Sequence, residues 1–265
     1  MRKKRPLGQN FLNDPNIAAE IIHQANIPPE ARVVEIGPGK GILTRELLEK
    51  AGSVLALEID PQLCKQLNRQ FDKQPKFELV QADAMTYDYS AAGSRYQVVS
   101  NLPYYAAMAI IKRLIHYRIH IVDMTLMLQK EVVDRLVAQP GTRAYGSLSV
   151  FTQFNCRAER LFEVKKGSFS PPPKVDSSVI KLTPLKETPV AVKNLKTFHH
   201  VVNTAFFHKR KMLRNNLKGL NKPYQIDIKK IEDAGIQLDR RGETLTLAEF
   251  AAIANLIEAN YDGPL

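Results

Sequence analysis

The chain has 265 residues, of which 44% are hydrophobic and 25% are charged. These values are ordinary for a globular protein, so they exclude a disordered, collagen-like or purely coiled-coil chain. Lysine and arginine total 38 while aspartate and glutamate total 27, a formal net charge of +11 that favours a polyanionic partner but specifies no fold.

The cysteines and the apolar runs bear on the cellular compartment. Cys64 and Cys156 lack the spacing of a disulfide framework or a zinc site, so we expect both thiols to be reduced. The basic residues 2–5 are followed by a polar stretch and not by the apolar segment of a signal peptide. No run approaches the roughly 20 apolar residues of a membrane span. We therefore predict a soluble, cytoplasmic protein with no membrane partner.

Apolar, β-rich runs alternate with helical patterns through the first half of the chain. The pair Asp14 and Pro15 is typical of a helix start. The predicted strands that follow are Arg32–Ile36, Val54–Glu58, Phe77–Gln81, Tyr96–Ser100 and Met124–Leu128. The predicted helices between or after them are Ile42–Ala51, Pro61–Phe71, Ala106–Tyr117 and Lys130–Ala138. This alternation predicts an α/β fold with a doubly wound parallel sheet and helices on both faces.

The alternation loosens after residue 140. Two more strands, Arg157–Val164 and Ser177–Leu182, are expected on either side of a loop that contains three consecutive prolines. Residues 183–189 have the composition of a linker. Beyond the linker every pattern is helical, with candidates at Asn194–His208, Lys209–Leu217, Ile226–Ala234 and Leu247–Asn260. We predict two domains, one over residues 1–186 and a small all-helical one over residues 187–265.

Charge is unevenly distributed in the predicted helical domain. Residues 188–226 contain eight lysines and arginines and no acid, whereas residues 231–265 contain two basic and seven acidic residues. A charge run is usually a solvated helix face, but 39 residues without a compensating acid favour contact with nucleic-acid phosphates. The strongest candidates are Lys209, Arg210, Lys211 and Arg214. We expect residues 2–5 to form a further arm that faces the same partner.

A glycine-rich turn follows the first strand of the predicted sheet. Val33–Gly41 reads VVEIGPGKG and leads into a helix, so a ligand can approach both the glycines and the free N–H groups of the helix start. A dinucleotide fingerprint needs glycine where Ile42 stands, and a P-loop needs serine or threonine where Gly41 stands. The remaining pattern, Glu35 and three alternating glycines, resembles motif I of class I S-adenosylmethionine-dependent methyltransferases. A glycine turn without a ligand is the alternative interpretation.

Two acids follow at the ends of later predicted strands. Glu58 ends the second strand, where a carboxylate can accept hydrogen bonds from both hydroxyls of a ribose. Asp83 follows the third strand, and its counterpart in the methyltransferases accepts from the adenine amino group. Either acid alone is more often a solvated carboxylate at a strand end. Together, after the glycine turn, they predict a cofactor cleft in which Gly37 and Gly39 allow close approach.

The segment after the fourth predicted strand carries the most specific pattern. Asn101–Tyr104 reads NLPY and resembles the signature of methyltransferases that modify exocyclic amines of bases. The amine nitrogen of adenine delocalises its lone pair into the ring, so acceptors aimed at its hydrogens free that lone pair for a sulfonium methyl group. Asn101 offers a side-chain oxygen, Leu102 a main-chain oxygen, and Tyr104 a ring that can stack on an extracted base. An ordinary Asn-x-Pro-Tyr turn is the alternative.

Motifs along nearly the whole chain resemble those of ribosomal RNA adenine dimethyltransferases. The matching segments are Pro6–Leu12 (PLGQNFL), Glu35–Gly41, Asn101–Tyr104 and Phe169–Val175 (FSPPPKV). Two tail segments, Phe206–Leu217 and Gly235–Leu245, resemble the branch that acts on the small ribosomal subunit. The basic stretch that begins at His208 reads HKRKMLR and departs mildly from the common RRKTLR of that branch, but it keeps the charge.

The resemblance implies a Rossmann-like class I methyltransferase fold, and dimethylation of the 6-amino groups of two adjacent adenosines in the 3′-terminal hairpin loop of 16S rRNA. S-adenosylmethionine is the implied cofactor and S-adenosylhomocysteine the product, with no metal or general base. The resemblance also implies that Asn10, Leu12 and Asn101 touch the cofactor, and that Phe169 faces Tyr104 across the target base. The expected partner is 16S rRNA in an immature 30S subunit during late subunit biogenesis, and the expected enzyme is a monomer.

Two rival functions are compatible with part of this pattern. The macrolide-resistance branch dimethylates one adenosine of large-subunit rRNA and shares the cofactor motifs, but it typically has isoleucine where Leu102 stands and a different tail. A non-enzymatic RNA-binding assembly or transcription factor with a vestigial methyltransferase fold would not need the acids and the NLPY segment intact. The complete set therefore favours an enzyme of the small-subunit branch.

Overall fold

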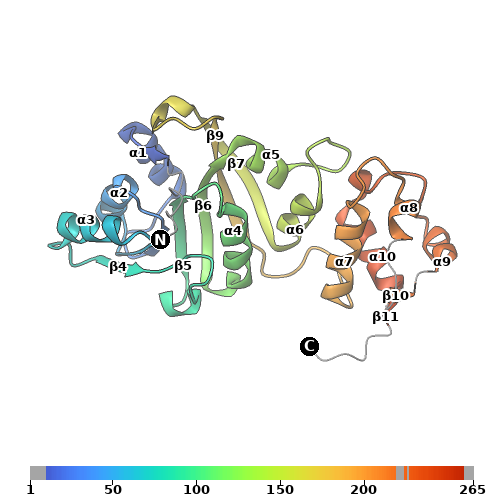
Figure 1. Ribbon diagram of the computed structural model, residues 1–265. Coiled ribbons are helices and arrows are strands. Elements are labelled where there is room, and N and C mark those ends of the chain that lie inside the picture. The colour runs from blue at the N-terminus through green and yellow to red at the C-terminus, as the bar shows by residue number, and fades with distance from the viewer. Residues whose placement is uncertain (1–9, 219–223, 226, 260–265) are drawn as a thin grey trace, which may run out of the picture. The chain divides into compact units, whose positions relative to one another are not determined.

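The computed structural model describes residues 10–218, 224–225 and 227–259, and Figure 1 shows their helices and strands. The contacts divide the chain into two units, Met1–Val133 with Arg157–Pro184 and Asp134–Cys156 with Leu185–Leu265. Residues 134–156, which the sequence assigns to the first domain, belong to the second unit, because Tyr145, Val150 and Phe154 are part of its apolar core. The basic residues 2–5 and the first four residues of the PLGQNFL motif lie outside the described residues.

The first unit is built on a seven-stranded sheet with the order β4-β3-β2-β5-β6-β9-β7. Its strands are β2 (Arg32–Ile36), β3 (Ser53–Glu58), β4 (Phe77–Gln81), β5 (Tyr96–Asn101), β6 (Ile121–Gln129), β7 (Cys156–Val164) and β9 (Ser177–Pro184). β2 pairs in parallel with β3 and β5, and the parallel pairs β3–β4 and β5–β6 extend the sheet on both sides. β9 runs antiparallel to β6. The five strands predicted before residue 130 therefore form the parallel part of a mixed sheet.

Helices connect the parallel strands and cover the sheet (Figure 1). They are α1 (Pro15–Ala25), α2 (Ile42–Lys50), α3 (Pro61–Phe71) and α4 (Ala107–His116), and α5 (Lys130–Val137) follows β6. The carboxylate of Asp14 accepts from the N–H of Asn16 at 3.0 Å, so it caps α1 as the sequence predicts. Asp60 caps α3 in the same way, accepting from the N–H of Gln62 at 2.8 Å. Cap chemistry therefore fixes where two of these helices begin.

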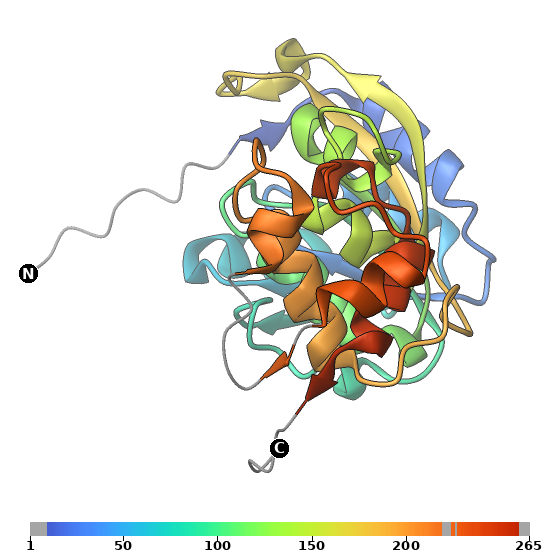
Figure 2. The same ribbon diagram turned by 90° about the vertical axis from the view of Figure 1, so that its right-hand side faces the viewer.

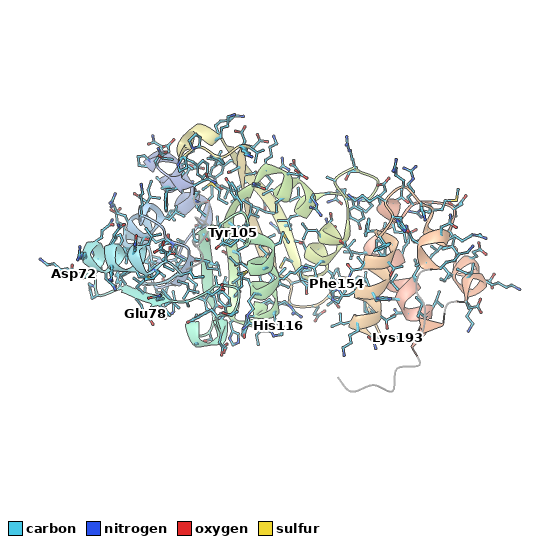
Figure 3. All side chains as sticks on the ribbon, in the orientation of Figure 1. Asp72, Glu78, Tyr105, His116, Phe154 and Lys193 are labelled. Carbon is cyan, nitrogen blue, oxygen red and sulfur yellow. The ribbon has the colours of Figure 1, made fainter. Side chains whose placement is uncertain are left out.

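The second unit is helical around its own apolar core. Its helices are α6 (Ser147–Asn155), α7 (Leu195–Ala205), α8 (Leu213–Leu217), α9 (Ile228–Asp233) and α10 (Leu247–Leu256). Two-residue strands, β10 (Tyr224–Gln225) and β11 (Glu258–Ala259), pair antiparallel beside them. Phe154, labelled in Figure 3, packs its ring 4.7 Å from that of Phe198 in this core. Over the described residues, the structure contains no helix with the length and apolarity needed to cross a bilayer.

The helix predicted over Lys209–Leu217 is shorter in the structure, where α8 begins at Leu213. The N–H groups of Leu213 and Arg214 donate to the carbonyls of Arg240 and Leu238, at 2.7 and 2.9 Å, and not to residues of a preceding helical turn. A helix needs these donors for its own carbonyls four residues back, so the chain turns before α8. We call residues 206–212 the α7–α8 turn.

A close backbone contact in the second unit gives a test of this packing. A methyl group added at Gly242 would lie 2.5 Å from the carbonyl oxygen of Ala205, which is backbone and cannot rotate away. We predict that Gly242→Ala lowers the free energy of unfolding by about 1–3 kcal/mol, as overpacking does. Gly146→Ala is the matched control, because nothing lies within 4 Å of its added methyl. Urea unfolding followed by circular dichroism measures the stability of both variants. Equal unfolding midpoints for Gly242→Ala and Gly146→Ala would contradict the close contact at Gly242.

Candidate active site

A cleft lies at the carboxyl edge of the parallel strands in the first unit. Its empty volume, which includes some open solvent, is about 1000 Å³. The register pairs Glu35 with Ala56 of β3 and with Val99 of β5, so the residues after these positions reach the same edge of the sheet. The predicted site residues that line this cleft are Asn10, Leu12, Gly37, Gly39, Glu58, Asp83, Asn101, Leu102 and Tyr104. The structure therefore brings together residues that are 94 positions apart in the sequence.

The glycine turn forms one wall of the cleft. Gly37 and Gly39 have φ angles of 64° and 59°, which side-chain-bearing residues rarely adopt. A methyl group at Gly39 would also lie 3.0 Å from the ring of Phe11. Phe11 belongs to β1 (Phe11–Leu12), and the ammonium of Lys40 lies 5.0 Å from the centre of its ring. The N-terminal strand therefore packs directly on the turn, which explains why Asn10 and Leu12 border the same cleft.

Glu58 ends β3 and points its carboxylate at the turn. One oxygen accepts from the N–H groups of Ile59 and Asp60, both at 2.9 Å, and the other accepts from the N–H of Gly39 at 3.3 Å. The side chain is only 3% exposed. Burial raises the pKa of this carboxyl, although the three backbone donors act against the shift. Glu58 is thus a fixed acceptor held by the backbone at the cleft.

Glu35 is a second buried acid of the cleft, for which the glycine motif alone predicts no separate role. It is 1% exposed, and its carboxylate accepts from the hydroxyl of Thr44 in α2 at 2.7 Å. Burial raises the pKa of Glu35 to about 8, the Thr44 hydrogen bond lowers it, and the nearby Glu58 raises it. The signal that could have found this residue is an acid two positions before Gly37 on a buried strand.

Asp83 lies two residues beyond the end of β4 and lines the cleft. Its carboxylate accepts from the N–H of Met85 at 2.8 Å, which fixes the local turn. Met85 and Ile59 also line the cleft and keep more than a third of their surface exposed. An acceptor in a cleft that also exposes two apolar side chains suits a planar, amino-bearing heterocycle.

The NLPY segment begins at the end of β5. Asn101 is the last residue of that strand and lines the cleft, and the N–H of Leu102 donates to the carbonyl of Met127 in β6 at 3.2 Å. Tyr104 is half-buried, and its hydroxyl lies 2.6 Å from that of Ser177 at the start of β9. Tyr105, labelled in Figure 3, is 60% exposed. The segment is therefore anchored to β6 and β9, while its asparagine faces the cleft.

Phe169 does not line this cleft in the structure. It lies in β8 (Phe169–Ser170), which pairs antiparallel with β1, so that Phe169 is opposite Leu12. Figure 2 shows the blue strand β1 beside the yellow segment that contains β8. The ring is 3% exposed and belongs to the apolar core of the first unit. Its predicted place opposite Tyr104 across a base stays a prediction.

The predicted phosphate-binding residues lie in the second unit. Lys209, Arg210 and Lys211 are exposed on the α7–α8 turn. Arg214, in α8, is also exposed and forms an ion pair with Glu232 of α9. Three of the four cations are thus available on one short turn, and the fourth has an acidic neighbour.

The cleft fits S-adenosylmethionine by the chemistry of its donors and acceptors. The residues along it offer carboxylates for the ribose hydroxyls and the adenine amine, and two glycines leave space where a side chain would block approach. Glu35 adds a buried carboxyl group that is hydrogen-bonded to Thr44 of α2. Within the described ranges, no group of three or more histidine, cysteine, aspartate or glutamate side chains is arranged to hold a metal ion.

Comparisons with known proteins cover nearly the full chain. A family model described as ribosomal RNA adenine dimethylase matches residues 1–259. Ribosomal RNA small subunit methyltransferase A of Hahella chejuensis is 41% identical over 265 residues, covering 99% of this chain and 94% of the relative. The protein of the same name from Legionella pneumophila is 41% identical over 254 residues, with 96% and 97% covered.

Two solved structures are similar over most of their length. A dimethyladenosine transferase from Plasmodium falciparum has a TM-score of 0.77 at 26% identity, and the match covers 91% of this chain and 94% of that one. The 23S rRNA methyltransferase ErmE has a TM-score of 0.72 at 27% identity, with 93% and 99% covered.

The raised pKa of Glu35 predicts a pH dependence of stability. Between its ordinary value of 4.5 and about 8, the folded protein holds a proton that the unfolded chain has released. Stability must therefore fall as the pH rises through this window, by up to about 1.4 kcal/mol per pH unit. Glu35→Gln has no such proton, so we expect its stability to rise relative to wild type from about pH 5 to about pH 8. Parallel curves of unfolding free energy against pH, measured by urea titration without added ligand, would contradict the burial of an ionisable Glu35.

Proposed function

The chain belongs to the ribosomal RNA adenine dimethylase family, and we propose on this premise that it dimethylates two adjacent adenosines in the 3′-terminal hairpin loop of 16S rRNA. It is an S-adenosylmethionine-dependent rRNA adenine dimethyltransferase with the class I methyltransferase fold that the sequence predicted. The observation that carries the finer proposal is the NLPY segment, which ends β5 in the same cleft as the glycine turn and Glu58. We propose a cytoplasmic monomer that acts on an immature 30S subunit late in its assembly.

We assign cofactor binding to the residues that line the cleft from β1, the glycine turn, the end of β3 and the segment after β4. Glu58 accepts from the ribose hydroxyls, because its carboxylate is already fixed by backbone donors and keeps lone pairs for a ligand. Asp83 accepts from the adenine amine, and the side chains of Asn10 and Leu12 close the cleft from β1. When bound, S-adenosylmethionine supplies the electrophilic methyl group. Gly37 and Gly39 permit its close approach to the backbone.

Activation of the target amine is assigned to Asn101 and Leu102. The side-chain oxygen of Asn101 and the main-chain oxygen of Leu102 accept the two amine hydrogens and favour a pyramidal nitrogen. The lone pair is then directed at the methyl group, and the quaternised nitrogen loses its proton readily, so no general base is needed. Asn101 is suited to this role because it lines the cleft on a strand end anchored to β6.

We assign binding of the flipped base to two aromatic residues, Tyr104 and Phe169. Tyr104 lines the cleft and is held by its hydrogen bond to Ser177, so its ring is pre-positioned for stacking. Phe169 is the proposed partner on the opposite face of the base. Its packed position opposite Leu12 requires a local rearrangement of β1 and β8 for that contact.

Docking of the substrate is assigned to the second unit. Lys209, Arg210 and Lys211 are exposed together on the α7–α8 turn, and residues 188–226 hold no acid that would compete for them. Arg214 is the fourth proposed contact, although Glu232 is its neighbour. Few side chains are placed to read base edges, so we expect the assembled, immature subunit to be a better substrate than naked rRNA.

The catalytic assignment predicts a separation of binding from chemistry. Asn101→Ala should keep the fold and the RNA affinity but lower the single-turnover methylation rate about 100-fold or more, because one acceptor of the transition state is lost. Asn68→Ala, on the exposed face of α3, is the control and should methylate like wild type. Products are located by primer extension across both rRNA subunits. A rate near wild type in Asn101→Ala, or modification of large-subunit rRNA alone, would refute the assignment.

The docking assignment predicts a dependence on charge and salt. Reversing Lys209, Arg210 and Lys211 to glutamate should impair binding to small-subunit particles, with S-adenosylmethionine affinity unchanged. Binding by wild type should weaken with salt at a log–log slope of about −0.7 to −0.9 per phosphate contacted, and the variant should show a shallower slope. A control with the same change in net charge reverses Lys50, Lys65 and Lys73 on α2, α3 and the turn after α3. Equal loss of binding in both variants, measured by filter binding, would indicate a general charge effect and no docking turn.

A further inference from the structure

We infer that Phe207 is a base-stacking residue, so that the α7–α8 turn binds an unpaired RNA base on this ring while the neighbouring cations bind phosphates. The inference rests on the docking function proposed above and adds a contact that charge alone does not provide. The observation behind it is an exposed aromatic side chain near the start of the α7–α8 turn, just before the cations of that turn. Phe207 is 78% exposed, and Met212, at the other end of the turn, is 51% exposed.

The exposure of Phe207 distinguishes it from the other phenylalanines. The chain has eleven, all within the described residues, and Phe207 is the one whose ring is mostly in solvent. Its neighbour Phe206 points inward, where its ring packs 5.9 Å from that of Tyr145 and 5.7 Å from that of Phe250. Because Phe206 is anchored in the core, the side chain of Phe207 is directed outward. The fold therefore presents this ring to solvent.

The backbone that carries Phe207 is held in place. Asn216 is buried, and its side-chain amide donates to the carbonyls of Ala205 at 2.9 Å and His208 at 3.2 Å, on either side of Phe207. The N–H of Phe207 itself donates to the carbonyl of Thr204 at 3.1 Å. A contact residue on a fixed turn loses less conformational entropy on binding than one on a free loop. The ring is thus presented in a defined position.

The charges around the ring favour RNA over other occupants. Lys209, Arg210 and Lys211 follow within four residues, and two acids of the same unit, Glu232 and Glu243, form ion pairs with Arg214 and Arg241. Aromatic rings that stack on bases, combined with cations that bind the backbone, are the usual equipment of single-stranded nucleic-acid sites. The substrate of this family is RNA, whose loops and bulges expose unstacked bases. An unpaired rRNA base beside the phosphates bound by the turn is therefore the occupant we assign.

A tryptophan reporter tests stacking directly. The chain contains no tryptophan, so Phe207→Trp places a single indole at the proposed contact. We expect its fluorescence to be quenched when small-subunit particles are titrated in, because the indole stacks on a base. Leu195→Trp, at an exposed position in α7 of the same unit, is the matched reporter and should be quenched little. Two results would overturn the inference. In the first, the particles bind but quench neither indole; in the second, they quench both indoles equally.

An affinity series separates stacking from charge. Phe207→Ala should weaken binding to small-subunit particles about 5- to 150-fold, with the salt slope unchanged because no phosphate contact is lost. Phe207→Trp should keep wild-type affinity, whereas Phe207→Leu should behave like alanine if the ring face matters. The melting temperature should stay at the wild-type value in all three, because the ring is exposed. Full binding by Phe207→Ala, or by Phe207→Leu, would overturn the inference.

The outcomes also separate this inference from the docking proposal. In one outcome, the charge-reversed variant of Lys209, Arg210 and Lys211 binds weakly while Phe207→Ala binds fully. That result would support the docking proposal and refute base stacking by Phe207. Full binding by both variants would refute docking as well. Flotation with phosphatidylserine vesicles is a third measurement, which tests whether Phe207 binds a membrane surface and not RNA. Loss of vesicle binding in Phe207→Ala with unchanged affinity for subunits would assign the ring to a membrane surface and overturn the assignment to RNA.

Discussion

The parallel pairing of β2 with β3 and β5 is the constraint on which the rest of the site depends. Parallel strands end at one edge, so a register that sets Glu35 beside Ala56 and Val99 also delivers Glu58 and Asn101 to one cleft. A shift of two residues in either pairing would move a carboxylate or the amide about 7 Å along the strand. Methyl transfer needs a cofactor and a base amine at contact distance. The register of three strands therefore sets the geometry of the reaction before any side chain is considered.

Burial of two carboxylates is the cost of this arrangement. Glu35 is enclosed with a single side-chain hydrogen bond, and Glu58 depends on three backbone donors, one from Gly39 in the glycine turn and two from Ile59 and Asp60 after β3. Both acids have raised pKa values because burial outweighs their hydrogen bonds. A core optimised for stability alone would place apolar residues there. Buried acids that line a cleft are typical of ligand sites.

Local chemistry made much of this site predictable from the sequence. The aspartate–proline helix starts, the glycines with positive φ, and the acids after successive strands each have a short-range physical cause. Long-range contacts were harder to predict. The reassignment of residues 134–156 depends on Phe154 packing with Phe198, and the late start of the helix predicted over Lys209–Leu217 depends on the Arg240 carbonyl. The buried position of Phe169 opposite Leu12 and the outward position of Phe207 also depend on partners distant in sequence.

We propose that the end of β3 places Glu58 as the ribose acceptor of a cofactor cleft. Calorimetric titration of S-adenosylmethionine into wild type and Glu58→Ala measures it most directly, with Glu49→Ala on the exposed face of α2 as the control. A charge-assisted hydrogen bond accounts for about 1.5–3 kcal/mol, so the account predicts about 10- to 150-fold weaker binding by Glu58→Ala and wild-type affinity in the control. Equal affinity in all three proteins would contradict it.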